Sequence, residues 1–426
     1  MIQEISSSQE GINLEKQYGA HNYHPLPVVL SRGEGVYLWD IEGKKYFDFL
    51  SAYSAVNQGH CHPRIKNALI EQAGTLTLSS RAFHNDVLGP YEKYITEYFG
   101  FDKVLPMNTG VEAVETAIKI VRKWGYDKKG IAENQARIIV ANNNFHGRTT
   151  TVISFSNDDN AREKFGPFTP GFINIPYNDL PALEEVLESQ PNIVGFLIEP
   201  VQGEAGVVTP DEDYIRDAAQ LCRKHNVLLL ADEIQTGIGR TGSLLAVCGN
   251  CNCEGHCEKQ ASYTAPDILI LGKALSGGFY PVSAVLANDD IMNVIHPGQH
   301  GSTFGGNPLG AKIAMTALEV VRDEKLAQNA RKLGKIFRER MRLLIEKSEW
   351  IALVRGRGLL NAIVINDSPE SSTAWEICLA MKENGLLAKP THGNIIRFAP
   401  PLVMTEEELH CCCDIIEKTI LQFKKS

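Results

Sequence analysis

The clearest hydrophobic pattern begins near residue 110, in the segment VEAVETAIKIVRKWG. Apolar side chains recur there every three or four positions, the spacing of one buried stripe along a helix. The stripe consists of Val111, Val114, Ile118 and Val121. The preceding Asn108-Thr109-Gly110 supplies a cap and a flexible turn. This segment therefore predicts an amphipathic helix that begins at residues 108–110.

The middle of the chain alternates unbroken apolar runs with helical ones. NIVGFLIEP and NVLLLADE are apolar without polar alternation, and the helical pattern DYIRDAAQLCRKH separates them. DILILG, at residues 267–272, is a further short apolar run. Strands that are buried on both faces and joined by helices are typical of a parallel sheet built from βαβ units. We therefore expect an α/β domain here.

After Pro308 the pattern changes to a long helix-like segment, residues 310–345, followed by short strands around LLNAIVI and IIRFAPP. This part predicts a second, smaller α+β domain. The expected organisation has an N-terminal segment that joins the small domain, a large domain with a cysteine-rich insertion at 248–265, and a C-terminal small domain. These three parts span residues 1–55, 56–310 and 311–426.

Composition and charge narrow the function classes. The chain has 426 residues, 43% hydrophobic and 22% charged, enough for two or three domains around large cores. Its net charge of -9 argues against nucleic acid and anionic membranes as partners. No apolar run approaches the roughly 20 residues that span a bilayer. The N-terminal residues lack the pattern of a secretion or import signal, so we expect a cytoplasmic enzyme.

Three candidate strand ends carry polar residues: Glu199, Asp232 and Lys273. Ligands of open parallel sheets bind beyond the carboxyl ends of the strands. A lysine that is partly desolvated there has a lowered pKa and a nucleophilic amine. A neighbouring carboxylate keeps a pyridine nitrogen protonated, so Lys273 and Asp232 form a candidate pair for pyridoxal 5'-phosphate (PLP). A solvated loop lysine and a turn-forming aspartate are the simpler alternatives.

The predicted helix at residue 110 offers a place for a cofactor phosphate. Thr109, Gly110 and Val111 lie at its N-terminus, where free backbone N–H groups and the helix dipole favour an anion. An ordinary capped helix has the same sequence pattern, so this feature alone does not establish a phosphate site.

The segment VCGNCNCEGHCEK places four cysteines in a C-x₂-C-x-C-x₃-C pattern: Cys248, Cys251, Cys253 and Cys257. Four thiolates at this spacing fit a structural zinc ion or an iron–sulfur cluster. A redox-sensitive thiol pair and an inert surface loop remain alternatives. The other six cysteines lack the spacing of a disulfide framework, which favours free thiols in a reducing compartment.

Several longer motifs point to a known family. They are, in chain order, MNTGVEAVETAIK, NFHGRT, EPVQGEAGV, ADEIQTGIGRTG, DILILGKALSGG and GSTFGGNPLG. Together they resemble the class III aminotransferases of the fold-type I PLP-dependent transferases, over nearly the whole chain. This resemblance implies a large domain with a mostly parallel central sheet flanked by helices, a smaller α+β domain, and a homodimer with shared active sites.

The resemblance also implies roles for individual residues. Lys273 would be the Schiff-base lysine and general base, and Asp232 the partner of the pyridinium nitrogen. The further cofactor contacts would be Gln235 to the ring hydroxyl, Phe145 on the ring face, Gly110 and Val111 to the phosphate, and Ser302 and Thr303 to the phosphate of the neighbouring subunit. Core packing explains Phe145, and a loop hydroxyl explains Thr303, when each is taken alone.

Other segments, among them YGAHNYHPLPVVL and FLSAYSAVNQGHCHP, are similar to family members that transfer the δ-amino group of L-ornithine to 2-oxoglutarate. In that case Glu204 would neutralise Arg397 while ornithine is bound, and Arg397 would bind the α-carboxylate of the keto acid. Arg148 would hold the far carboxylate of either substrate, and Tyr23 and Tyr53 would line the ornithine end.

Two rival functions remain at this point. The first is another class III enzyme that acts on acetylornithine or 4-aminobutyrate, or an aminomutase. The second is a metal-dependent binding protein in which the cysteine cluster recognises a partner and the aminotransferase core is silent. The presence of both Lys273 and Asp232 argues against the second.

Overall fold

A seven-stranded sheet forms the centre of the larger part of the molecule. The computed structural model describes residues 5–248 and 265–425. The strands, in spatial order, are β4 (Lys103–Met107), β10 (Ser283–Ala287), β9 (Ile268–Leu271), β8 (Leu228–Asp232), β7 (Ile193–Ile198), β5 (Arg137–Ala141) and β6 (Phe172–Ile175). All neighbouring strands from β9 to β6 are parallel, and β10 alone runs antiparallel to both of its neighbours. The predicted mostly parallel α/β sheet is therefore confirmed.

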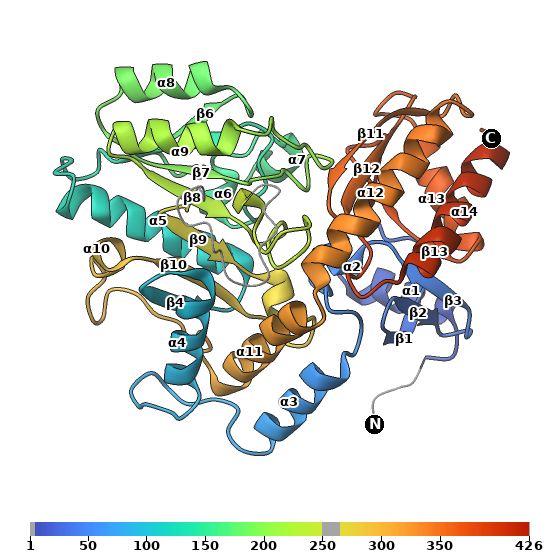
Figure 1. The fold of residues 1–426 in the computed structure, drawn as a ribbon, viewed down its shortest axis with the longest axis horizontal. Coiled ribbons are helices and arrows are strands. Elements are labelled where there is room, and N and C mark those ends of the chain that lie inside the picture. Colours follow the sequence, from blue (N-terminus) through green and yellow to red (C-terminus); the bar gives the residue numbers. More distant parts are fainter. Residues whose placement is uncertain (1–4, 249–264, 426) are drawn as a thin grey trace.

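Both faces of this sheet are buried. Along β9, Ile268 and Ile270 belong to one hydrophobic cluster, and Leu269 and Leu271 to another. Because alternate side chains of a strand point to opposite faces, each face has its own core. Helix α5 (Gly110–Asp127) packs on one face, and helices such as α9 (Tyr214–Lys224) cover the other (Figure 1). This arrangement explains why the strands read as unbroken apolar runs.

The predicted helices lie where the sequence placed them, but the segment predicted as one long helix forms two. Helix α5 begins after Thr109, which forms a capping box with Glu112. The long helix-like segment at 310–345 is not one helix, because the chain turns at Lys325, whose φ is 52°. It forms two helices, α11 (Pro308–Asp323) and α12 (Leu326–Ile345).

The smaller part contains two four-stranded sheets. The first has the order β1 (Leu30–Glu34), β2 (Tyr37–Asp40), β3 (Lys45–Asp48) and β13 (Leu386–Leu387). The second has the order β11 (Ile351–Arg357), β12 (Leu360–Ile365), β15 (Ile395–Phe398) and β14 (Lys389–Thr391). Since β13 pairs with β3, the N-terminal strands lie beside the C-terminal elements (Figure 1).

The contacts of the two long helices bear on the domain division. Helix α11 packs against α3 (Pro63–Ala73) and α4 (Leu88–Phe99), whereas α12 packs against α14 (Glu406–Gln422) and β11. We therefore propose that the boundary falls between α11 and α12 and not after residue 310.

The remaining helices are α1 (Ser8–Tyr18), α2 (Ser51–Ser54), α6 (Thr150–Ile153), α7 (Asp159–Arg162), α8 (Leu180–Ser189), α10 (Asp289–Met292), α13 (Thr373–Glu383) and the 3₁₀ turns η1 (Ala246–Cys248) and η2 (Lys273–Ser276).

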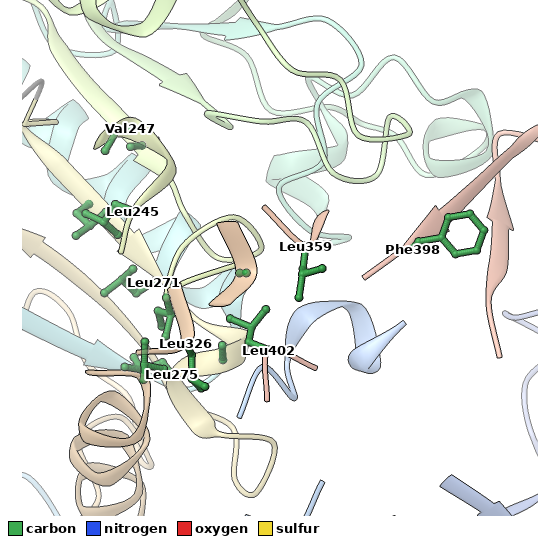
Figure 2. Packing of buried hydrophobic residues seen from close by; sticks show 14 of the residues in the cluster. Leu245, Val247, Leu271, Leu275, Leu326, Leu359, Phe398 and Leu402 are labelled. Carbon is green, nitrogen blue, oxygen red and sulfur yellow. The ribbon is translucent and has the colours of Figure 1, made fainter. Parts of the chain in front are cut away.

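One hydrophobic cluster joins the two parts of the molecule. Leu271 and Leu275, on either side of Lys273, belong to the same cluster as Leu402 and Phe398 from the C-terminal region (Figure 2). Because interiors are close-packed, this continuity fixes the position of the end of β9. Within the described part of the chain, no helix is long and apolar enough to cross a membrane.

Candidate active site

The carboxyl edge of the large sheet holds the three predicted polar strand ends. Asp232 ends β8, Lys273 follows β9 after Gly272, and Glu199 follows β7. All three line one cavity of about 250 Å³, together with Gly110, Val111, Phe145, His146, Gly147, Glu204, Ile234, Gln235 and Thr236. The structure therefore brings together Lys273, Asp232 and most of the predicted cofactor contacts.

Lys273 occupies an unusual backbone position. Its φ of 44° is in the left-handed region, which is uncommon outside glycine and concentrates at functional sites. Burial lowers the pKa of its amine, and the carboxylates of Glu204 and Asp232 oppose that shift only in part. The amine is thus easier to deprotonate than an ordinary lysine, as a nucleophile requires.

Asp232 is buried and has a partner that the sequence did not reveal. Its Oδ2 lies 2.7 Å from Nδ1 of His146, and its Oδ1 accepts a hydrogen bond of 3.1 Å from the backbone N–H of Ile234. Burial alone would lower the pKa of His146, but the hydrogen bond and the charge of Asp232 outweigh it and raise the pKa. The contact with His146 fixes the orientation of the Asp232 carboxylate.

His146 belongs to NFHGRT, a motif that carries the family resemblance, but no spacing pairs it with a residue 86 positions away. The local backbone explains the motif. Gly147 has a φ of +126°, and a Cβ on it would lie 2.4 Å from Cγ2 of Val111. Only glycine fits this turn. His146 lines this cavity and a second one beside it, whereas Arg148 lines only the second.

Glu199 and Phe145 lie next to each other in the first cavity. The backbone N–H of Phe145 donates a 3.0 Å hydrogen bond to Oε2 of Glu199. Burial raises the pKa of Glu199 to about 7. Phe145 lines both cavities, as a residue stacked on a bound ring would.

Glu204 lies between two predicted ligand-binding residues. Its Oε1 accepts a 2.6 Å hydrogen bond from Nη1 of Arg397 and a 3.0 Å bond from Nε2 of Gln235. Burial would raise the pKa of Glu204, but the Arg397 charge and these hydrogen bonds lower it. The Nε of Arg397 and the Oε1 of Gln235 are buried and have no hydrogen-bond partner among the described residues. Both atoms therefore keep an unused hydrogen-bonding capacity.

Tyr53 reaches the same place through a strained turn. Four successive residues, from Ser51 to Ser54, have φ values of 48°, 46°, 58° and 69°. Such conformations cost about 1–3 kcal/mol each in non-glycine residues. The turn places the Tyr53 ring 5.4 Å from Cζ of Arg397. Strain held beside a candidate substrate group supports a functional role for this tyrosine.

A second cavity, of about 630 Å³, adjoins the first and contains Arg148. Glu204, Phe145, His146 and Gly147 belong to both cavities. The Arg148 side chain is 58% exposed, and its Cζ lies 5.4 Å from the centre of the Phe145 ring. The predicted carboxylate clamp therefore lies at the open end of the site.

Five predicted residues do not line either cavity. Arg397 and Tyr53 are linked to the site through Glu204, whereas Tyr23, Ser302 and Thr303 are not. Tyr23 is 71% exposed, and its ring centre lies 5.8 Å from Nζ of Lys389. The Ser302 hydroxyl accepts a 2.8 Å hydrogen bond from Asn108, and Thr303 is exposed. A single chain thus leaves the last two outside its own site, where a role in a neighbouring subunit would put them.

The cysteine cluster falls almost entirely outside the described residues. Cys248 ends η1 and is half-buried, whereas Cys251, Cys253 and Cys257 lie in the undescribed segment 249–264. In residues 5–248 and 265–425, no group of three or more histidine, cysteine or acidic side chains is arranged to hold a metal ion.

Comparison with known proteins agrees with this site. Residues 18–420 match the family described as Aminotransferase class-III. The chain therefore belongs to the class III aminotransferases, which are PLP-dependent enzymes of the α/β fold-type I group.

Individual relatives are similar over almost their full length. The mitochondrial ornithine aminotransferase of Drosophila ananassae is 61% identical over 407 residues, 96% of this chain and 90% of that protein. The structure of ornithine aminotransferase from Toxoplasma gondii with partial occupancy of PLP has a TM-score of 0.93 at 48% identity, covering 98% of this chain and 95% of that one. Acetylornithine aminotransferase from Elizabethkingia anophelis has a TM-score of 0.87 at 62% identity, covering 98% and 99%.

Proposed function

We propose that this protein transfers the δ-amino group of L-ornithine to 2-oxoglutarate, giving glutamate 5-semialdehyde and glutamate in two half-reactions. The observation that carries the proposal is the Glu204 carboxylate, which bonds Arg397 at 2.6 Å and Gln235 at 3.0 Å beside Lys273. Ornithine reacts at its distal amine and brings no carboxylate to this point, whereas 2-oxoglutarate brings its α-carboxylate. A glutamate that neutralises Arg397 in one half-reaction and releases it in the other serves both substrates.

The residues present fit PLP. Asp232 would hold the ring nitrogen, and the unpartnered Oε1 of Gln235 would accept a hydrogen bond from the ring hydroxyl. The N-terminal backbone of α5 at Gly110 and Val111 would bind the phosphate. When bound, PLP supplies an aldehyde that combines with the substrate amine and a ring that accepts electrons.

The side chains then divide the work. Nζ of Lys273, with its lowered pKa, would act as the base that takes the proton from the δ-carbon of ornithine and as the acid that gives it back later in the half-reaction. Asp232, held in place by His146, would pair with the ring nitrogen and favour its protonated form. Arg148 binds the carboxylate far from the reacting carbon, and Tyr53 packs against the bound substrate near Arg397.

A second candidate has a specific observation in its favour. The Elizabethkingia anophelis protein, 62% identical to this chain, carries the name acetylornithine aminotransferase. The simultaneous presence of Tyr53, Glu204 and Arg397 in one place favours ornithine. The test is turnover of L-ornithine, N-acetylornithine and 4-aminobutyrate under identical conditions. A higher kcat/KM for N-acetylornithine would replace the proposal with this second candidate.

Three further predictions accompany the proposal. A homodimer would bring Ser302 and Thr303 of one subunit to the phosphate in the other. Light scattering of the purified protein measures its molar mass and tests for the dimer.

The second prediction is zinc or iron bound at Cys248, Cys251, Cys253 and Cys257. Metal analysis of the purified protein tests it.

The third prediction is a cytoplasmic location, which differs from the mitochondrial one in the name of the Drosophila relative. Cell fractionation tests it.

A further inference from the structure

We propose that Asp158 is a specificity-determining residue that competes with substrate carboxylates for Arg148. This inference rests on the proposed function, because it takes Arg148 as the group that binds the carboxylate remote from the reacting carbon. Asp158 acts through Arg148 and touches no reacting atom, so it is a positioning residue.

The geometry of the open cavity carries the inference. Nη1 of Arg148 lies 3.5 Å from Oδ2 of Asp158, and both residues line the cavity of about 630 Å³ next to Phe145. Among the described carboxylates, Asp158 alone lies within ion-pair distance of Arg148. A substrate carboxylate that binds the guanidinium as a bidentate partner must displace this contact.

Asp158 is held in place independently of Arg148. Its Oδ1 accepts a 3.0 Å hydrogen bond from the backbone N–H of Asn160, as the N-cap of α7, and its own N–H donates to Oγ of Ser156 at 3.1 Å. Only Oδ2 faces Arg148. The turn therefore needs an oxygen acceptor at this position, but it does not need the negative charge.

The outer pair resembles the inner pair of Glu204 and Arg397 but is weaker. The Arg397 side chain is 6% exposed and its contact is 2.6 Å, whereas the Arg148 side chain is 58% exposed and its contact is 3.5 Å. Exposed ion pairs contribute little to stability. Asp158 therefore raises the KM of substrates that carry a remote carboxylate by a modest factor. Both products carry that carboxylate too, so the same competition favours their release.

The test is Asp158→Asn in the PLP-loaded enzyme, since asparagine keeps the N-cap acceptor. We expect KM for L-ornithine and for 2-oxoglutarate to fall by about two- to fivefold, with kcat within about twofold of the unchanged enzyme. KM for 1,4-diaminobutane, which is ornithine without its carboxylate, should not change. A fall for this diamine equal to that for ornithine, or no fall for ornithine, would overturn the proposal.

Asp159→Asn is the matched control. Asp159 lines the same cavity, and no described cation lies within ion-pair distance of it. Its substitution by asparagine removes the same charge as Asp158→Asn. We expect it to leave KM for both substrates nearly unchanged. An effect as large as that of Asp158→Asn would mean that general charge, and not the contact with Arg148, is responsible.

Arg148→Ala separates this inference from the proposed function. If Arg148→Ala raises KM for both carboxylate substrates and Asp158→Asn changes neither, the inference alone fails. If Arg148→Ala leaves both KM values unchanged, the assigned role of Arg148 fails and the inference fails with it.

Discussion

The two ends of the active-site region are built differently. At the inner end, Asp232 ends β8 and Lys273 follows β9, and the other residues of these strands belong to the hydrophobic core. At the outer end, Arg148 and Asp158 lie in loops around α6 and α7 with solvent-exposed side chains. The inner end can change proton affinities because its carboxylates are buried, whereas the exposed outer end sorts ligands by charge. Chemistry and selectivity thus occupy regions of different dielectric character.

The largest expected effect is at the inner end. Lys273→Ala should lower kcat by on the order of a thousandfold or more, because no other described side chain at this edge combines an amine with a lowered pKa. The variant should still bind PLP through contacts such as Asp232. Steady-state rates and the cofactor absorbance after gel filtration measure both. Near-normal turnover would remove Lys273 from the mechanism.

The inner end should also show a pH-dependent effect on stability. Burial raises the pKa of Glu199 from 4.5 to about 7. Below about pH 4.5 this carboxyl is protonated in both the folded and the unfolded chain, and between pH 4.5 and 7 mainly the unfolded chain loses the proton. The contribution of Glu199 to the free energy of unfolding therefore falls by up to about 3 kcal/mol between pH 4.5 and 7. Above pH 7 it stays at this lower value.

Glu199→Gln removes that titration. The free energy of unfolding of the variant, minus that of the unchanged protein, should rise from pH 4.5 to pH 8 in urea denaturation of the PLP-free chains. Titrations common to both proteins cancel in the difference. A difference that stays flat or declines over this range would show that Glu199 ionises normally in the fold.

A smaller effect is expected where the two ends meet. Glu204→Gln frees Arg397 from its 2.6 Å ion pair. Substrates that bring an α-carboxylate to Arg397, such as glutamate as donor, should gain about tenfold in kcat/KM, and ornithine should gain nothing. The ratio of kcat/KM for glutamate as donor to kcat/KM for ornithine, compared between the variant and the unchanged enzyme, measures this effect. An unchanged ratio would mean that Glu204 does not govern access to Arg397.

The smallest of these effects belongs to the outer end. Arg148→Lys keeps the charge but loses the bidentate fork, so KM for both carboxylate substrates should rise about three- to tenfold with little change in kcat. Steady-state kinetics with each substrate varied in turn would measure it. A fall in kcat as large as that of Lys273→Ala would erase the distinction between the two ends.

The sequence predicted the inner end better than the outer one, for physical reasons. Strands β8 and β9 are apolar up to Asp232 and Leu271, and α5 carries its own cap at Thr109, so local patterns placed Asp232 and Lys273 at strand ends. Their roles came from the family resemblance. The contact between His146 and Asp232 joins residues far apart in the chain and depends on the fold.

Other features had no local signal. The left-handed turn at Ser51–Ser54 contains no glycine, and neither does the turn at Lys325 that ends the continuity of the predicted long helix. The pair of Arg148 and Asp158 forms across a loop whose course the hydrophobic pattern does not encode. Tertiary contacts hold these conformations against local preference.

The most direct test of the account is the visible spectrum of the PLP-loaded protein before and after addition of L-ornithine without any keto acid. We predict that the absorbance band of the lysine-bound cofactor is lost with ornithine and persists with N-acetylornithine at the same concentration. A band that ornithine leaves unchanged would contradict the substrate assignment and the roles given to Glu204 and Arg397.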